Sequence, residues 1–241
     1  MRLAIIGSAG RMGRAVAAAA AGRAEIVAEA DRGDDLAAAL DGCDAYIDFS
    51  SPDATRAAAI AATVRRKAAV IGTTGLHDAD REAIAALVQV APVVHAANFS
   101  LGVNLVLGMA KQAARVLGDW DAEVVELHHG DKKDAPSGTA LAIARAIAAG
   151  RGADYDAVKR HGRDGDTGPR PPGEIGVSAV RGGDVIGEHV AYFFGAGERV
   201  ELAHRATSRA IFAQGALRAA VWVVGKPPGR YDMLDVLGFT A

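Results

Sequence analysis

Two hydrophobic patterns divide the chain near residue 99. In the first part, short apolar runs alternate with alanine-rich amphipathic stretches. This alternation is typical of βαβ units, in which the apolar runs form a parallel sheet. The predicted strands are residues 2–6, 25–30, 45–49, 68–72 and 93–97, and the predicted helices are residues 11–21, 52–66 and 79–90.

After Asn98 the runs lengthen and the order of elements changes. The expected elements are helices at 103–117 and 138–149 and strands at 122–128, 174–181, 185–194 and 199–205. The links Gly182-Gly183-Asp184 and Gly195-Ala196-Gly197 each predict a hairpin between the strands they join. Residues 150–173, which are rich in glycine, arginine and aspartate and include three prolines, predict a mobile loop.

The end of the chain predicts a helix at 208–224, with Thr207 or Ser208 as its N-cap, then a turn and a short helix. The apolar face of the long helix needs a partner, which we expect the first part of the chain to supply. That face consists of Ile211, Leu217 and Val221.

Together these elements predict an α/β fold with two domains. A Rossmann-type parallel sheet domain would occupy residues 1–99, completed by residues 206–241. Residues 100–205 would form a substrate-binding and oligomerisation domain, α+β with a mostly antiparallel sheet. An open sheet of this kind exposes an edge that another chain can join. We therefore expect a homo-oligomer built on these strands.

Composition narrows the class of protein. The 241 residues, 50% hydrophobic, are enough for a sizeable core. The balance of 27 basic and 29 acidic residues argues against a nucleic-acid partner. No apolar run approaches the roughly 18 residues of a membrane span, and the N-terminal run is too short for a signal peptide. The single Cys43 excludes an internal disulfide and a cysteine-based zinc site. We expect a soluble, cytoplasmic protein.

Three glycines lie between the first predicted strand and the first predicted helix. Gly7 would allow the tight turn, Gly10 the approach of a pyrophosphate to the helix N-terminus, and Gly13 close packing of helix on sheet. Ala9 stands where a further glycine is common, so the spacing is Gly-x-x-Gly-x-x-Gly. The pattern predicts a dinucleotide site, although packing glycines without a ligand would look the same.

The second predicted strand ends at an acidic residue, as ribose binding requires. Asp31 lies there, directly after the strand, and Glu29 is a competing but weaker candidate. The adjacent Arg32 is able to pair with a 2′-phosphate. Both NADH and NADPH therefore stay open as cofactors.

Two later loops also follow predicted strands, and ligands of open α/β sheets bind beyond the strand carboxyl ends. Their small and polar residues are candidates for bracketing a nicotinamide ring, although ordinary turns use the same residue types. These candidates are Gly72, Thr73 and Thr74 in one loop and Ala96, Ala97, Asn98 and Phe99 in the other.

The segment ELHHGDKKDAPSGTA, residues 126–140, combines proton donors, cations and a helix start. His128 and His129 would face opposite sides of a strand. Lys132 follows in the turn, and Ser137 is a natural N-cap for a helix whose first amides can hold a carboxylate. This combination suits an acidic substrate that gains a proton as it is reduced.

Other interpretations of the histidines and lysines stay open. A histidine pair is often structural, and paired lysines often lie in a solvated turn. A metal site formed with Asp131 or Asp134 is disfavoured, because adjacent histidines rarely face one ion. We expect His189 and His204 to face solvent or an interface, and His161 and Arg163 either to cover the site or to lie in a solvated loop. No Gly-x-Ser-x-Gly elbow supports a hydrolase.

These motifs resemble those of the dihydrodipicolinate reductase family, also called 4-hydroxy-tetrahydrodipicolinate reductase. The resemblance extends over essentially the whole chain and depends above all on HHGDKKDAPSGTA. It is also carried by GSAGRMGRAV, DFSSPDAT, GTTGL, AANFSLGVN and the tail GAGERVELAHRATSRAIFAQGALRAA. The resemblance implies NADH- or NADPH-dependent reduction of 4-hydroxy-tetrahydrodipicolinate to tetrahydrodipicolinate in the diaminopimelate route to lysine. It also implies a homotetramer.

The resemblance further implies roles for individual residues. His128 would donate or accept the catalytic proton, and Lys132 would donate one. His129 would contact the dicarboxylate substrate, and Gly138 and Thr139 would bind a carboxylate. Asp31 and Arg32 would lie at the adenosine ribose, and the loops named above would line the nicotinamide. The pyrophosphate would be held by Gly7, Ser8, Ala9, Gly10, Arg11 and Met12, and no metal would be required.

Two other functions are compatible with the same fold. An aspartate-dehydrogenase-like oxidoreductase would oxidise a saturated substrate and would not need the helix start at Ser137. A non-catalytic NADP-binding regulator would leave His128 and Lys132 without a role.

Overall fold

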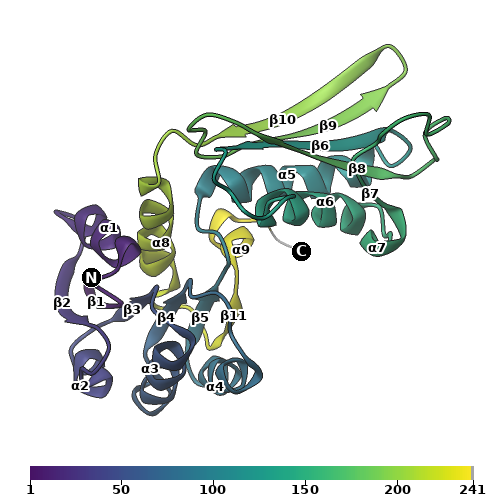
Figure 1. Ribbon diagram of the computed structural model, residues 1–241. Helices are drawn as coiled ribbons and strands as arrows, with labels where there is room; N and C mark the ends of the chain where they lie inside the picture. Colours follow the sequence, from purple (N-terminus) through teal and green to yellow (C-terminus); the bar gives the residue numbers. More distant parts are fainter. Residues whose placement is uncertain (240–241) are drawn as a thin grey trace. The chain divides into compact units, whose positions relative to one another are not determined.

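The computed structural model describes residues 1–239 and divides into two compact units (Figure 1). Unit 1 contains Met1–Leu101 and the chain from Ala210 onward, and unit 2 contains Gly102–Arg209. Within the described residues, no helix has both the length and the apolar character needed to cross a membrane.

Unit 1 is built on a parallel sheet with the strand order β11-β5-β4-β3-β1-β2. Its first ninety-five residues alternate strand and helix, as the hydrophobic pattern predicts. The strands are β1 (Arg2–Ile6), β2 (Glu25–Ala30), β3 (Ala45–Asp48), β4 (Ala68–Ile71), β5 (Pro92–His95) and β11 (Gly229–Tyr231). The helices are α1 (Arg11–Ala20), α2 (Leu36–Asp41), α3 (Pro52–Arg65), α4 (Asp78–Val88), α8 (Ala210–Val223) and α9 (Met233–Leu237).

Alternate residues of these strands serve two hydrophobic cores, one on each face of the sheet. Leu3 and Ile5 of β1 pack with α1, α8 and α9, whereas Ala4 and Ile6 pack with α2, α3 and α4. Figure 1 shows this division of the helices between the two faces. The central strands are buried on both sides, which explains their continuous apolar runs.

The last long helix returns to unit 1, as predicted. Leu217 is buried in the core beside α1, and Gly215 lies so close to the Phe99 carbonyl that a side chain there would clash. Val221 was expected on the packed face but is exposed. The sequence pattern also missed α2 and β11, whose few residues give too short a period to recognise.

Unit 2 consists of a five-stranded sheet whose core-facing side is covered by two helices (Figure 1). These two helices are α5 (Leu101–Val116) and α6 (Gly138–Gly150), and the short α7 (Tyr155–Val158) follows α6. The strands are β6 (Asp121–His128), β7 (Lys159–His161), β8 (Ile175–Arg181), β9 (Glu188–Gly195) and β10 (Glu198–Arg205). Val106 of α5 and Ile143 and Ile147 of α6 fill the core against Val124 and Phe193 of the sheet.

The strand order β10-β9-β6-β8-β7 corrects one of the two predicted hairpins. β9 and β10 pair antiparallel across Gly195-Ala196-Gly197, as expected. β8 and β9 do not pair with each other, because β6 lies between them, antiparallel to β9 and parallel to β8. A glycine link therefore signals a turn but does not identify the strands that pair.

The segment 150–173 is more ordered than a mobile loop. It contains α7 and β7, and β7 pairs with β8. Arg163 forms ion pairs with Glu123 and Glu174. Glu123 lies near the start of β6, whereas His128 is the last residue of that strand. These contacts therefore hold the loop at the end of β6 that is far from His128. The alternative in which Arg163 covers the site is therefore not observed. The ring of His161 contacts the hydroxyl of Tyr155, within the same segment.

Candidate active site

His128 is the last residue of β6, on the face of the sheet that α6 covers. The strand alternates buried and partly exposed positions, and His128 takes the last buried one. Its Nδ1 lies 2.5 Å from Oε2 of Glu126, which is two residues earlier on the same face. His129 follows the end of the strand, and its backbone amide donates to the Val185 carbonyl. The two histidines therefore have different environments, as adjacent residues at a strand end should.

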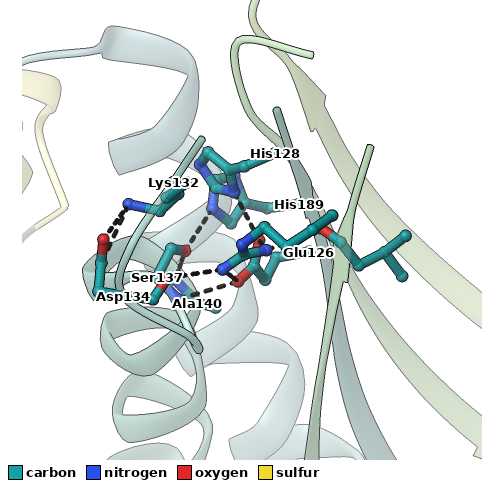
Figure 2. Close-up of polar contacts among 9 residues, drawn as sticks. Glu126, His128, Lys132, Asp134, Ser137, Ala140 and His189 are labelled. Carbon is teal, nitrogen blue, oxygen red and sulfur yellow. Dashed lines mark hydrogen bonds and ion pairs between the residues drawn. The ribbon is translucent and has the colours of Figure 1, made fainter. Parts of the chain in front are cut away.

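Glu126 is fully buried and holds the site together (Figure 2). Arg181 of β8 donates to both carboxylate oxygens, at 2.9 and 2.8 Å, and the backbone amide of Ser137 donates to Oε1 at 2.9 Å. Burial would raise the pKa of this carboxyl, but the hydrogen bonds from Arg181 and His128 hold that pKa below its ordinary value. Glu126 is therefore an ionised acceptor for the proton on His128 Nδ1.

Sequence reasoning missed Glu126 and Arg181 as site residues. A signal for Glu126 was present, because a glutamate at a core-facing strand position two residues before a histidine needs a partner. Arg181 lies 55 positions away in the sequence, and only the pairing of β6 with β8 brings it opposite His128.

Helix α6 begins at the site. The Ser137 hydroxyl caps the helix by accepting from the Ala140 amide at 3.1 Å, which confirms the predicted N-cap. Gly138 and Thr139 form the first turn, where backbone amides favour an anion. His189 of β9 lies 3.0 Å from the Ser137 hydroxyl through its Nε2 and is only 4% exposed. The expectation that His189 faces solvent or an interface is therefore wrong.

Lys132 lies in the turn between β6 and α6 and pairs with Asp134 at 2.8 Å (Figure 2). The lysine side chain is about one-fifth exposed and the aspartate largely exposed. An ion pair open to solvent contributes little stability and is readily exchanged for another anion. Among residues 1–239 no group of histidine, cysteine and acidic side chains is arranged to hold a metal ion.

In unit 1 the glycine loop has the geometry that its sequence predicts. Gly7 has a φ of +82°, which permits the tight turn after β1. A Cβ atom on Gly13 would lie 2.2 Å from the Gly7 carbonyl oxygen, so only glycine allows this closeness between helix and loop. The Asp31 carboxylate accepts from the Ser8 hydroxyl at 2.5 Å and from the Ala9 amide at 2.9 Å. The acid after β2 is thus fixed to the loop.

A cavity of about 870 Å³ opens beside this loop. Four of the predicted cofactor residues line it, namely Gly7, Gly10, Asp31 and Arg32. The loops at 72–74 and 96–99 are not part of its lining. Phe99 is buried in the core and its ring packs edge-on against Phe49, so its side chain serves the fold.

A second buried carboxylate, Asp48 at the end of β3, organises two loops of unit 1. It accepts hydrogen bonds from the Ser50 hydroxyl and amide and from the Thr55 and Thr73 hydroxyls. Burial raises the pKa of Asp48, and these hydrogen bonds oppose that rise. The predicted residue Thr73 is therefore positioned by an acid that the sequence analysis did not single out.

Comparisons with known proteins find relatives that match both units of the chain. A family model described as "Dihydrodipicolinate reductase, N-terminus" matches residues 1–99, and one described as "Dihydrodipicolinate reductase, C-terminus" matches residues 102–237. The 4-hydroxy-tetrahydrodipicolinate reductase of Caulobacter vibrioides is 49% identical over 251 aligned residues, covering 99% of this chain and 98% of that protein. The enzyme of the same name from Alkalilimnicola ehrlichii is 47% identical and covers 98% of both.

The chain belongs to the dihydrodipicolinate reductase family. A solved structure of dipicolinate-bound dihydrodipicolinate reductase from Paenisporosarcina sp. TG-14 has a TM-score of 0.83 at 25% identity and covers 98% of each chain. A solved structure of a probable dehydrogenase from Thermotoga maritima is 13% identical and has a TM-score of 0.65. The alignment covers 99% of this chain and 93% of that one, and at this identity it shows a shared fold alone. The predicted family, fold class and enzyme class, an NAD(P)-dependent oxidoreductase, are confirmed.

Dihydrodipicolinate reductases use a nicotinamide cofactor, and the glycine loop of unit 1 fits such a group. Within the described chain no side chain caps α1, so the first amides of that helix are available to a phosphate. The positive φ of Gly7 and the close packing at Gly13 bring this helix start against the end of β1.

The hydrogen bonds of Glu126 predict a pH dependence of folding stability in this reductase. Because its pKa is lower in the folded state, ionised Glu126 stabilises the fold above its unfolded-state pKa, and this contribution is lost as the pH falls through the folded-state pKa. Glu126→Gln should lower the free energy of unfolding by roughly 3 kcal/mol at pH 7, by leaving Arg181 without its anion. The difference from wild type should narrow towards about pH 3.

Urea unfolding monitored by circular dichroism between those pH values measures this effect. Glu82→Gln, at an exposed position of α4, is the matched control and should follow the wild-type profile. Parallel profiles for wild type and Glu126→Gln would show that the carboxylate does not carry the expected pH-dependent stability.

Proposed function

We propose that the chain reduces 4-hydroxy-tetrahydrodipicolinate to tetrahydrodipicolinate with a reduced nicotinamide cofactor, in the diaminopimelate route to lysine. The observation that carries this proposal is the buried Glu126–His128 pair beside the start of α6. One small region thus offers a proton-transfer group and an anion site, which suits a dicarboxylate that gains a proton on reduction. Relatives named for this reaction match the chain from end to end.

In this proposal His128 exchanges a proton through Nε2. Its Nδ1–H donates to Glu126, so Nε2 is the atom left for the substrate. Gly187 leaves room there, because a Cβ atom at that position would lie 2.9 Å from Nε2. Glu126 also stabilises the protonated ring while it carries the positive charge.

Lys132 and the start of α6 bind the carboxylates. A substrate carboxylate can replace Asp134 as the partner of Lys132, since that ion pair is open to solvent. Gly138 and Thr139 present the first turn of α6 to an anion, and His129 provides a further contact. A nicotinamide cofactor, when bound, would supply the hydride. Either His128 or Lys132 supplies the proton, and the 4-hydroxyl group leaves as water overall.

Removal of either proton-bearing group should lower turnover strongly. His128→Gln and Lys132→Met are each expected to reduce kcat by about 100-fold or more, with cofactor affinity little changed. His161→Gln, at an exposed position of β7, is the control and should keep wild-type kinetics. The measurement is steady-state cofactor oxidation together with a fluorescence titration of cofactor binding.

Unchanged turnover in both variants would contradict the proposed roles. Wild-type protein that binds the cofactor but turns over no tetrahydrodipicolinate precursor would instead favour the non-catalytic regulator. Reduction of NAD with L-aspartate would favour the aspartate-dehydrogenase alternative.

We further propose that the chain uses NADH in preference to NADPH. The cavity beside the glycine loop is lined by one guanidinium, that of Arg32, and by four carboxylates. These acids are Asp31, Asp34, Asp35 and Asp53. Asp31 lies where the adenosine ribose of a dinucleotide binds, and the net negative charge around it disfavours a 2′-phosphate.

Removal of one of these four negative charges, at a position where the structure is kept, should weaken the preference for NADH over NADPH. Asp35 caps α2 by accepting from the Ala37 and Ala38 amides, and asparagine caps helices equally well. Asp35→Asn should therefore lower the dissociation constant of NADPH roughly two- to fivefold and leave that of NADH unchanged. Asp78→Asn, on the exposed start of α4, should change neither value. Equal affinity of wild-type protein for both cofactors would refute the preference.

We also propose that four copies assemble through the sheet of unit 2, in the cytoplasm where the reduced cofactor is available. α5 and α6 cover one face of this sheet, and the other face is open (Figure 1). The open face carries the exposed Val180 and Phe194, and the Tyr192 ring stacks on Phe194. β10 is an edge strand of eight residues. The unpaired backbone groups of such an edge promote aggregation unless another chain covers them.

A charge on this face should disrupt the assembly. Phe194→Asp is expected to shift the species seen by sedimentation velocity from tetramer to smaller forms, because the carboxylate would be buried without a partner. Val64→Asp, which adds the same charge at a valine 79% exposed on α3, should remain tetrameric. A wild-type monomer, or a tetramer in both variants, would exclude this interface.

A further inference from the structure

His189 is a buried histidine that touches two parts of the site. Its ring lies edge-on to that of His128, with 5.2 Å between ring centroids and 76° between planes. Its Nε2 lies 3.0 Å from the Ser137 hydroxyl oxygen (Figure 2). The residue lies on β9 opposite Glu126, 52 positions from Ser137 in the sequence. None of the roles assigned above uses it.

The surroundings of His189 determine which nitrogen carries its proton. Burial and the nearby His128 lower the pKa of His189 to about 4, so the ring is neutral at pH 7 and has one N–H. Its Nδ1 is buried and meets no hydrogen-bond partner within residues 1–239. An unpaired buried donor is rarer than an unpaired acceptor, so the hydrogen lies on Nε2. The ring therefore donates to the Ser137 oxygen.

This donation fixes the direction of the Ser137 hydroxyl hydrogen. The oxygen already accepts from the Ala140 amide at 3.1 Å and now also accepts from His189. A hydroxyl has two acceptor sites and one hydrogen. With both acceptor sites filled, the hydrogen points away from Ala140 and His189, as a further donor at the start of α6.

We propose that His189 is a positioning residue that locks the Ser137 hydroxyl as a hydrogen-bond donor to a substrate carboxylate. The proposal rests on the proposed reductase function, which supplies the dicarboxylate. If His189 carried its hydrogen on Nδ1 instead, the Ser137 hydroxyl would be able to donate to Nε2 of the imidazole. The start of α6 would then have one hydrogen-bond donor fewer for the substrate. His189 thus acts on substrate binding through Ser137 and does not itself contact the reacting atoms.

Two polar variants of similar size test the lock. In His189→Gln the side-chain amide nitrogen reaches about as far as imidazole Nε2, whereas in His189→Asn it ends near the position of Nδ1. The asparagine variant should raise the substrate KM about tenfold, as expected for a hydrogen bond to a charged group, with kcat changed less than threefold. The glutamine variant should restore the KM to within about threefold of wild type.

Calorimetric titration with pyridine-2,6-dicarboxylate provides a readout that does not depend on turnover, and its dissociation constant should follow the same order. Ser137→Ala should weaken binding as much as His189→Asn does, and the double variant should lose no more than either single one. Equal KM values for the glutamine and asparagine variants, or additive losses in the double variant, would overturn the proposal.

Failure of the lock and failure of the proposed reaction give different results. Wild-type protein that neither binds the dicarboxylate nor turns over the substrate would remove the reductase function itself. Wild-type activity together with unaltered binding in His189→Asn would remove only the role of His189. If His189→Asn does not fold, His189→Leu, which fills the buried site without a donor to Ser137, takes its place: it should weaken dicarboxylate binding about tenfold relative to His189→Gln, and equal binding by these two variants would overturn the role of His189.

Discussion

Unit 2 depends on one buried negative charge, that of Glu126. A carboxylate taken out of water is costly unless every oxygen finds donors. Glu126 meets that demand with His128 on its own strand, Arg181 on the next strand and the Ser137 amide at the start of α6. The same contacts therefore fix the imidazole, the pairing of β6 with β8 and the position of the helix start.

Unit 1 also contains a buried carboxylate, that of Asp48, but it has a different role. Asp48 is buried at the end of β3 and draws together hydroxyls that follow β3 and β4, those of Ser50 and Thr73. Within residues 1–239 no arginine pairs with Asp48, and burial raises the pKa of this carboxyl. In contrast, Arg181 and His128 lower the pKa of Glu126. The second carboxylate thus orders loops, and the first also prepares an ionised partner for an imidazole.

Much of this was predictable from the sequence, because the period of the hydrophobic pattern and the glycine loop are local signals. β1, α1, β6 and α6 fall within one or two residues of their predicted bounds. The pairing of the strands was not predictable in the same way. Gly182 and Gly183 indicated a turn, but β6 and not β9 is the neighbour of β8. That choice depends on contacts across the whole of unit 2. Register cannot be obtained from a turn alone.

The site shows the same division between local and distant information. His128, Lys132 and Ser137 lie within ten positions of one another, so their chemistry was evident as a motif. Arg181 and His189 lie on strands more than forty positions downstream, and nothing in their local sequence marks them. The motif carries the candidate catalytic groups, while the mixed sheet supplies Arg181 and His189, which contact Glu126 and Ser137. A chain that kept the motif but lost the pairing of β6 with β8 and β9 would keep the reactive side chains and lose their orientation.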